Sequence, residues 1–377
     1  MKKIILVLAI FVLAALGISA FAIYSSAAGN FSDEPDKYEK LWREVKEFEY
    51  KDLPKSALDK VEAILSLATK EHNDYQQIKA TTYKAKFLVQ ASQDGNLKAL
   101  DFLEEQANVQ EGTGKHICNF LIGAMYQNYY SRNRYNIDTR SVVSDSADKK
   151  GSRLEFYDKN EFKKQIISHY KLAINPELKK VEAKEFKEFF NDGKSVDDFF
   201  PTLYDRLAYS VILQLDKLNY YYHSNTNLDD SFFCNANDFM KLKIENSDEN
   251  AEMASLYIYQ QMLSENQSNN AVFSFVDYNR IKYSASRQKG KDDKIMELYN
   301  DAAKKYAGLE SVIFINAEIA DLLSEKSSKD LVDAVKLLES TVLQFKDSKY
   351  INICTNKLEK IKFPKMDINT ERIVHPE

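Results

Sequence analysis

Glycine and proline are scarce in this sequence. Only 10 of its 377 residues are glycine and 6 are proline, whereas ordinary domains carry about 7% and about 5%. β-Sandwiches and phosphate-binding α/β enzymes need these residues at their many turns and ligand loops. The scarcity argues against both architectures and favours long helices joined by short links.

Cysteine is also scarce, and neither sign of charge dominates. Cys118, Cys234 and Cys354 are far apart and odd in number, so they predict no disulfide framework, and we expect buried single thiols. The 52 Lys and Arg residues face 57 Asp and Glu residues, which gives a formal net charge of -5. This balance offers no basic surface to a nucleic acid, so we expect none as a partner.

A long hydrophobic run lies at the N-terminus. Lys2-Lys3 precede an uncharged apolar run over residues 4–16, and the small-x-small step Ala20-Phe21-Ala22 follows. This layout is typical of a secretory signal peptide, so we predict cleavage after residues 1–22. The alternative is an uncut membrane anchor, because the mainly apolar stretch 4–24 reaches the roughly 20 residues that cross a bilayer core. In both cases the body is exported to the periplasm or cell envelope, and membrane contact is expected only through this stretch.

After a polar linker at 23–35, apolar residues recur at steps of three and four, as on one face of an α-helix. The first region, 36–225, opens with a stripe from Tyr38 to Phe48, and Pro54 suits the first turn of the next helix. Short links between stripes favour antiparallel helical hairpins. Further helices of this region are predicted around 73–88, 97–103, 115–131, 162–174, 181–190 and 201–221.

One stretch of the first region, 132–158, loses the helical periodicity. It is polar and charged, with the run Ser144-Asp145-Ser146 near its middle. Such a stretch between periodic segments is typical of a surface loop, which we predict here.

The second region, 226–362, has the clearest repetition. Four helix candidates of similar size cover 292–306, 309–323, 330–345 and 349–361. The link at 345–349 resembles the one between helices of tetratricopeptide repeats, although the tryptophan and proline of the strict repeat are missing. The predicted fold class is therefore all-α, with tetratricopeptide-like stacked helical hairpins (an α-solenoid) in which each hairpin needs its neighbour.

The pattern changes in the C-terminal segment, 363–377. Pro364 ends the helices, and Met366 and Ile368 alternate with polar residues before Ile373-Val374, which is the period of a strand. A lone strand is not stable, so this segment is predicted to begin a truncated β-domain.

No motif in the sequence anchors catalysis or a metal site. The five histidines are scattered, and His116-x-Cys118 is the nearest approach to a pair of metal ligands. The sequence lacks a glycine-rich phosphate loop and a Gly-x-Ser-x-Gly elbow. Adjacent acids such as Asp197-Asp198 suit helix starts, where they complement the helix dipole. We therefore predict no catalytic, cofactor-binding or metal-binding residues, no cofactor and no enzyme.

Aromatic residues are abundant, with 23 Tyr, 22 Phe and a single Trp. They cluster at Tyr126, Tyr129 and Tyr130, at 220–222, and at Phe232-Phe233. Such clusters suit either a glycan- or peptide-binding groove or the interfaces between hairpins. Their helical spacing favours the interfaces.

Several segments resemble a known family. The opening Tyr38–Val45, continued by Asp52–Leu58, is similar to the opening of the large exported bacterial alpha-2-macroglobulin-like proteins found in Bacteroidetes. In that family a helical region precedes a string of macroglobulin-type β-sandwich domains, and the tail 366–374 looks like the first strand of them. Further similar segments follow in the family's order and span most of the chain, at 77–80, 129–135, 201–205 and 280–283.

The resemblance implies a cell-envelope protein related to protease-trapping endopeptidase inhibitors. Those proteins use a cleavable bait region and, in some members, a reactive thioester. A thioester needs Cys-x-x-Gln, and none of the three cysteines here has Gln at that position. The chain is therefore expected to be a non-catalytic scaffold whose partners are proteins: macroglobulin-type domains, proteases or envelope proteins. The alternatives are a stand-alone tetratricopeptide-like envelope adaptor and an enzyme with an unrecognised site.

Overall fold

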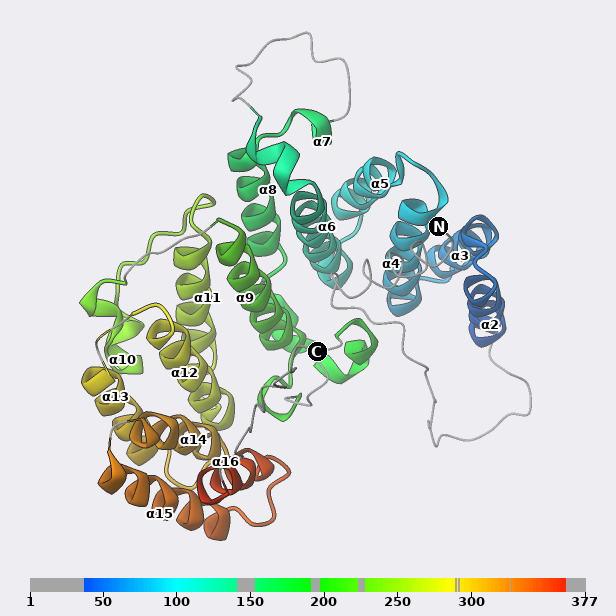
Figure 1. The fold of residues 1–377 in the computed structure, drawn as a ribbon. Helices are drawn as coiled ribbons and strands as arrows, with labels where there is room; N and C mark the ends of the chain where they lie inside the picture. Colours follow the sequence, from blue (N-terminus) through cyan, green and yellow to red (C-terminus); the bar gives the residue numbers. More distant parts are fainter. Residues whose placement is uncertain are drawn as a thin grey trace, which may run out of the picture. The chain divides into compact units, whose positions relative to one another are not determined.

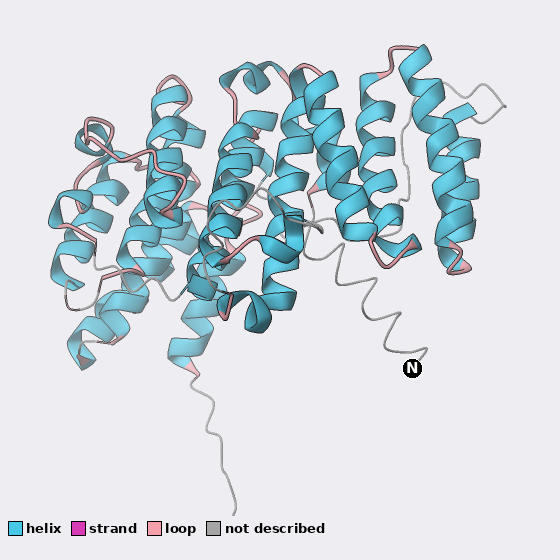
Figure 2. Ribbon diagram, turned by 90° about the horizontal axis from the view of Figure 1, so that it is seen from above, coloured by secondary structure: helices cyan, strands magenta, loops and turns pink. Residues whose placement is uncertain are grey.

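The computed structural model describes residues 37–140, 153–190, 197–222, 228–288, 290, 292–325 and 327–363. Within these ranges the regular structure is helical and no strand occurs (Figure 2). The predicted all-α class is thus confirmed for the described residues. None of the helices described is long and apolar enough to cross a bilayer. The predicted signal or anchor, the linker and the β segment from residue 364 onward lie outside the described residues.

Internal contacts divide the chain into two compact units. The first takes Met1–Ser224 and Ile244–Ile258, and the second takes Asn225–Lys243 and Tyr259–Glu377. Residues 244–258 join the first unit although the boundary expected from the sequence assigns them to the second region. Lys171 is one link between these residues and the rest of the first unit, because its ammonium donates to the carbonyl of Asn246 at 2.9 Å and to the carboxylate of Asp248.

The helices of the first unit begin at local signals. Pro54 occupies the first turn of its helix, and the side chains of Asn73 and Asp158 accept the backbone N–H of Gln76 and Glu161 at 3.1 and 2.8 Å. The α-helices are α2 (Lys37–Tyr50), α3 (Pro54–Lys70), α4 (Asp74–Ala91), α5 (Gly95–Val109), α6 (Gly112–Asp138), α7 (Arg153–Phe156), α8 (Lys159–Leu172) and α9 (Leu203–Tyr222). Three 3-10 helices cover Pro176–Lys180, Ala183–Phe189 and Asp197–Phe199.

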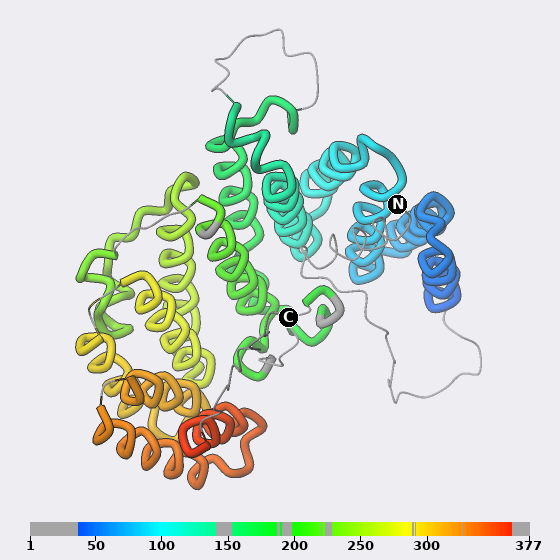
Figure 3. The backbone as a smooth tube through the Cα atoms, viewed as in Figure 1, coloured from blue at the N-terminus to red at the C-terminus, as the bar shows by residue number. Residues whose placement is uncertain are grey.

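The predicted apolar stripes form the core of the first hairpins. Val45, Val61, Ile64 and Phe87 are at most 1% exposed, and each fully buried side chain of this kind stabilises by about 2 kcal/mol. Helices α2 to α6 follow one another as rods that lie side by side (Figures 1 and 3). In addition, α4 contacts α6, which follows it by two positions.

The second unit repeats this arrangement with the four helices predicted over 292–361. Ala317, Ala320 and Ala334 are at most 2% exposed, and their small side chains let facing helices approach closely. Contacts also join α12 to α14 and α14 to α16. The elements of this unit are α10 (Ala236–Phe239), α12 (Asn270–Ala285), α13 (Asp292–Lys305), α14 (Ser311–Ser324), α15 (Ser328–Gln344), α16 (Asn352–Lys362) and the 3-10 helix Asp230–Phe232. The division between the two units falls within α11 (Ala251–Glu265).

The predicted loop at 132–158 is wrong at both ends. Helix α6 continues to Asp138, and α7 begins at Arg153, while the residues between 140 and 153 lie outside the described part of the chain. Ile137 is fully buried, and the Asp138 carboxylate accepts a hydrogen bond from the Tyr130 hydroxyl at 2.7 Å. One buried side chain and polar pairs along the helix therefore hold this end of α6, and neither produces a repeating apolar pattern.

The helix predicted at 181–190 is also wrong. The segment instead contains a 3-10 helix that is kinked at Phe186, where φ is −113° and ψ is 17°. An isolated antiparallel bridge precedes it, in which the N–H of Ala183 donates to Pro201 and the N–H of Leu203 donates to Val181, at 2.9 and 2.8 Å. Backbone groups that an α-helix would use are thus committed to a neighbouring segment.

Helices α6 and α8 are in tight contact at Gly123. A Cβ atom added at this glycine would lie 2.8 Å from the ring of Tyr170, closer than real Cβ contacts. The Tyr170 ring is fully buried, and its hydroxyl donates to the Gln127 side chain at 2.6 Å. The ring therefore has little freedom to move aside.

We expect Gly123→Ala to destabilise the first unit by about 1–3 kcal/mol through overpacking. Helix propensity alone predicts the opposite sign, because alanine within a helix stabilises by roughly 0.5–1 kcal/mol relative to glycine. Urea unfolding followed by circular dichroism measures the difference. Gly114→Ala on the same helix is the control, since the added methyl meets only the Gln110 side chain, which can move. A Gly123→Ala variant as stable as the parent would contradict the close contact.

Candidate functional site

The nearest approach to a metal-ligand pair, His116 and Cys118, does not form a metal site. His116 Nδ1 lies 2.8 Å from the carbonyl of Leu172, and Nε2 lies 2.7 Å from a carboxylate oxygen of Glu177. Burial raises the pKa of the Cys118 thiol to about 12. Across the described ranges, no three His, Cys, Asp or Glu residues are grouped so that they could hold a metal ion. His116 instead ties α6 to the end of α8 and to the 3-10 helix that follows.

The other two thiols are unpaired as well. Cys354 is buried and donates to the carbonyl of Ile313 at 3.3 Å, and burial raises its pKa to about 11. Cys234 is half-buried, and burial raises its pKa too. The expectation of single thiols is confirmed, and full burial holds for Cys118 and Cys354. Since the thiolate is the reactive form, these pKa directions disfavour nucleophilic chemistry.

The tyrosine cluster on α6 lies in a helix interface. Tyr126 and Tyr130 are at most 1% exposed. Tyr130 stacks on Tyr222 of α9 with ring centroids 5.0 Å apart, and Tyr129 stacks on Phe162 of α8 at 5.7 Å. The interface interpretation of this cluster is therefore confirmed.

His169 of α8 belongs to the same interface and is neutral at pH 7. Its ring stacks on Tyr126 at 6.0 Å between centroids, and its Nδ1 lies 3.0 Å from Asn119 Oδ1. The Asn119 amide nitrogen donates to the carbonyl of Lys115 at 2.9 Å, which assigns the proton of His169 to Nδ1. Burial, assisted by the positive charge of Arg153, lowers the pKa of His169 to about 4.

The core of the second unit contains a fully buried ion pair. The Arg280 guanidinium, 0% exposed, donates to one oxygen of Asp277 from Nε at 3.0 Å and from Nη2 at 2.6 Å. The Tyr306 hydroxyl donates to the other oxygen at 2.7 Å, and Arg280 also donates to the carbonyl of Phe232 at 3.3 Å. Its guanidinium lies over the ring of Phe239 at 4.7 Å. The bonds to Tyr306 and Phe232 join α12 to the end of α13 and to the segment before α10. They therefore stabilise the packing of this unit.

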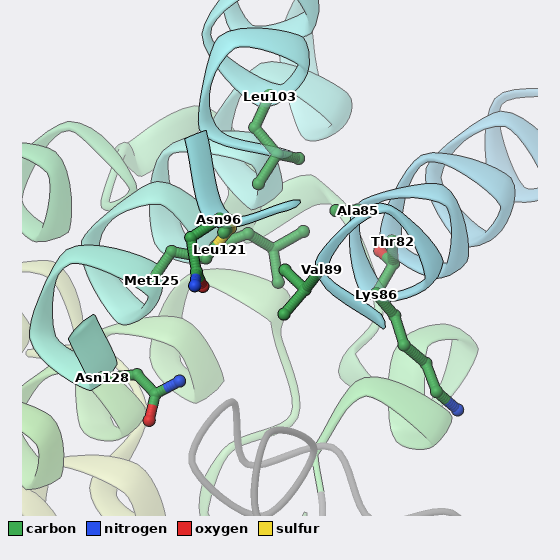
Figure 4. A pocket seen from close by; sticks show the side chains of 9 residues that line it. All are labelled: Thr82, Ala85, Lys86, Val89, Asn96, Leu103, Leu121, Met125 and Asn128. Atoms are coloured by element: carbon green, nitrogen blue, oxygen red, sulfur yellow. The ribbon is translucent and has the colours of Figure 1, made fainter. Parts of the chain in front are cut away.

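A small cavity of about 10 Å³, which is room for about one water molecule, lies between α4, α5 and α6 in the first unit. Gly95 brings the start of α5 against α4, since an added Cβ would lie 2.3 Å from the carbonyl oxygen of Leu88. Nearby Ala85 presents only a methyl group, which leaves room between α4 and α6. The lining residues are Thr82, Ala85, Lys86 and Val89 of α4, Asn96 and Leu103 of α5, and Leu121, Met125 and Asn128 of α6 (Figure 4).

The sequence did not predict this cavity. Its lining residues on α4 and α6 recur at steps of three and four, which is the same pattern that predicts packing. A weaker signal was present, because Asn128 continues the stripe of Leu121 and Met125 with a carboxamide. This cavity is the candidate functional site, since it combines apolar walls with a few polar groups, and its size admits about one water molecule.

Comparisons with protein-family models, with curated proteins and with solved structures found no match for the chain. The resemblance to alpha-2-macroglobulin-like proteins is therefore carried by the sequence segments alone.

The pKa of His169 predicts a pH dependence of stability. Between about pH 6.5 and pH 4 the unfolded chain binds a proton at this residue and the folded chain does not. The free energy of unfolding therefore falls as the pH decreases through this window, by on the order of 3 kcal/mol from this residue. We expect His169→Phe, which keeps a ring against Tyr126, to remove that contribution.

Urea unfolding at several pH values between 4 and 7 measures this difference in slope between parent and variant. His72→Asn is the control, because His72 is an exposed histidine in the turn before α4. The same slope in His169→Phe as in the parent would show that His169 is not held neutral in the fold.

Proposed function

We propose that the chain is a non-catalytic, exported scaffold that holds protein partners in the cell envelope. It corresponds to the N-terminal helical region of an alpha-2-macroglobulin-like protein and folds as a tetratricopeptide-like solenoid. The observation that carries the proposal is that helices pack in the order in which they follow one another along the chain. Helices α2 to α6 and α12 to α16 contact their chain neighbours, and α4–α6, α12–α14 and α14–α16 contact across one helix. Stacks of this kind present long surfaces to partners.

The reactive side chains are engaged inside the fold, which supports a role without catalysis. Cys118 and Arg280 are fully buried, and His169 is stacked and hydrogen-bonded inside a helix interface. A general acid or base must come within hydrogen-bond reach of its substrate. These groups are directed instead at other parts of the fold.

The segments that carry the family resemblance all lie in the helical body of the chain, which supports the proposal. Each places at least one buried residue in the helical core: Trp42, Ala80, Tyr130, Leu203 and Arg280. These segments thus belong to the helical body that the proposal assigns to the scaffold.

The proposal is tested first at the gene and then in the cell. We expect the DNA after codon 377 to continue into macroglobulin-type β-domains, and we expect the exported protein to begin near residue 23 by N-terminal sequencing. Deleting codons 37–363 from that gene is expected to leave exported β-domains that no longer protect a protein substrate from an added protease. A full-length gene with the exposed substitution Asn136→Leu controls for expression and export.

Two outcomes would contradict this proposal in different ways. A stop followed by unrelated genes removes the macroglobulin assignment and favours the stand-alone adaptor. Unchanged protease restraint after the deletion removes the scaffold role itself.

A further inference from the structure

His116, near the start of α6, faces an acceptor at each of its ring nitrogens. Its Nδ1 lies 2.8 Å from the backbone carbonyl oxygen of Leu172, and its Nε2 lies 2.7 Å from a carboxylate oxygen of Glu177. A carbonyl and a carboxylate only accept hydrogen bonds, whereas a neutral imidazole has a single N–H to donate. Both contacts are therefore hydrogen bonds only if both ring nitrogens carry a proton, which makes His116 a cation in this arrangement.

The carbonyl of Leu172 needs this side chain because of the residue that follows α8. In a continuing α-helix the carbonyl would accept the backbone N–H four residues later, at position 176. That residue is Pro176, which has no N–H. His116 supplies the missing donor at the C-terminal end of α8, where the helix dipole also favours a positive charge.

Glu177 supplies the second acceptor from the 3-10 helix Pro176–Lys180. The side chain of His116 is 8% exposed and that of Glu177 is 50% exposed. A buried cation needs a partner, and the carboxylate provides it. When the ring loses one proton, it keeps a single N–H. The carboxylate can then turn to water, whereas the carbonyl cannot, so the bond to Glu177 is the one that opens.

Other charged groups near His116 in the chain are exposed or bound to other residues. The exposed ones are Glu111, Lys115 and Lys180. On α8, Lys171 binds Asn246 and Asp248, and on the 3-10 helix Lys179 lies over the ring of Tyr204. Charged groups on the other elements that contact α6 also have partners elsewhere: Lys79 at Trp42, Lys86 at Glu49, Glu104 at Arg153, Asp205 at Thr202 and Arg206 at Phe190.

Two neutral groups of the same interface also titrate, but not in the range where histidines usually do. The pKa of His169 is about 4 and that of the Cys118 thiol is about 12. Between about pH 6 and pH 9, where an imidazole loses its charge, neither group changes its protonation. A pH-dependent change at this junction in that range therefore reports on His116.

We propose that His116 is a proton-dependent latch, which in its doubly protonated form fastens the 3-10 helix Pro176–Lys180 to α6. Loss of one proton as the pH rises releases Glu177 and loosens this 3-10 helix, while α6 and α8 stay packed. The contribution of His116 to stability is thus present at low pH and lost as the pH rises, which is the opposite sign to that of His169. The inference goes beyond the scaffold function, since it does not depend on which partner the chain holds.

NMR of the full chain with ¹⁵N-labelled histidines observes the protonation of both ring nitrogens. The reference in the same sample is His72, which is exposed in the turn before α4. We expect His116 to keep both protons to a higher pH than His72, because two acceptors hold them. The proton that leaves is expected to be the one on Nε2, since Nδ1 keeps its bond to Leu172.

Hydrogen exchange measures the loosening of the 3-10 helix. The amides of Leu178 and Val181 donate to the carbonyls of Asn175 and Leu178 at 3.0 and 3.1 Å. Their protection factors, which correct for the intrinsic effect of pH on exchange, are expected to fall as His116 loses its second proton. The expected fall is at least about tenfold, the low end of what a hydrogen bond to a charged group supplies.

Variants connect the two measurements. Glu177→Gln keeps an acceptor oxygen and removes the charge, so we expect both the titration of His116 and the fall in protection to move to lower pH. The control, Glu182→Gln, makes the same change at an exposed glutamate of the same segment and is expected to alter neither. In His116→Gln, the protection of Leu178 and Val181 is expected to be low and independent of pH across this range. Circular dichroism verifies that each variant is folded.

Titration of His116 together with His72 would overturn the proposal, because the two acceptors would then not hold the second proton. Protection factors at Leu178 and Val181 that stay constant while His116 titrates would also overturn it, since the bond would then fasten nothing. Neither result touches the deletion experiment on protease restraint, so failure of this inference is distinguishable from failure of the scaffold function.

Discussion

The structure of each unit depends on one constraint, which is that the apolar stripe of an amphipathic helix must be covered by another helix. Val45 of α2, Val61 of α3 and Phe87 of α4 are buried because successive helices lie against one another. In the second unit Ala320 and Leu338 are fully buried at the contact of α14 and α15. Because each stripe is satisfied by the next helix in the chain, the core is a sequence of local interfaces within each unit and requires no central sheet.

The same constraint explains how the polar side chains between helices are paired. When helices pack closely, any polar group in the interface must find a partner there. His169 and Asn119 satisfy each other across α6 and α8, and Asp277 is satisfied by Arg280 and Tyr306. The His169–Asn119 and Tyr306–Asp277 hydrogen bonds join neighbouring elements, whereas Asp277 and Arg280 pair within α12. Breaking one side of a buried ion pair is strongly destabilising. Residues that resemble catalytic groups in the sequence thus contribute to the interfaces between helices.

Much of the fold followed from composition and periodicity. The low glycine and proline content indicated helices. The apolar stripes located most of them, because the residues that a helix buries recur at the helical period. The prediction of helix boundaries failed in two segments whose structure depends on interactions other than a repeating apolar stripe. The end of α6 rests on Ile137 and on polar pairs, and the segment after Val181 is diverted by a backbone bridge to Pro201 and Leu203. Neither cause repeats along the chain, so neither produces a pattern.

The candidate site was harder to predict than the fold. The residues that line the cavity are spaced as core residues, and only the three-dimensional approach of α5 at Gly95, beside the small Ala85, leaves space among them. The volume between helices depends on how helices meet, which sequence spacing does not specify.

Hydrogen exchange on a chain shortened from its N-terminus tests the central claim of serial packing most directly. With residues 1–72 removed, α4 loses α3, one of the helices that pack against it, whereas α8 and α9 keep their neighbours. The account predicts that amide protection falls in α4, less in α5 and α6, and stays unchanged in α8 and α9. Loss of protection throughout the first unit would instead mean that it folds around one shared core, which would contradict the account.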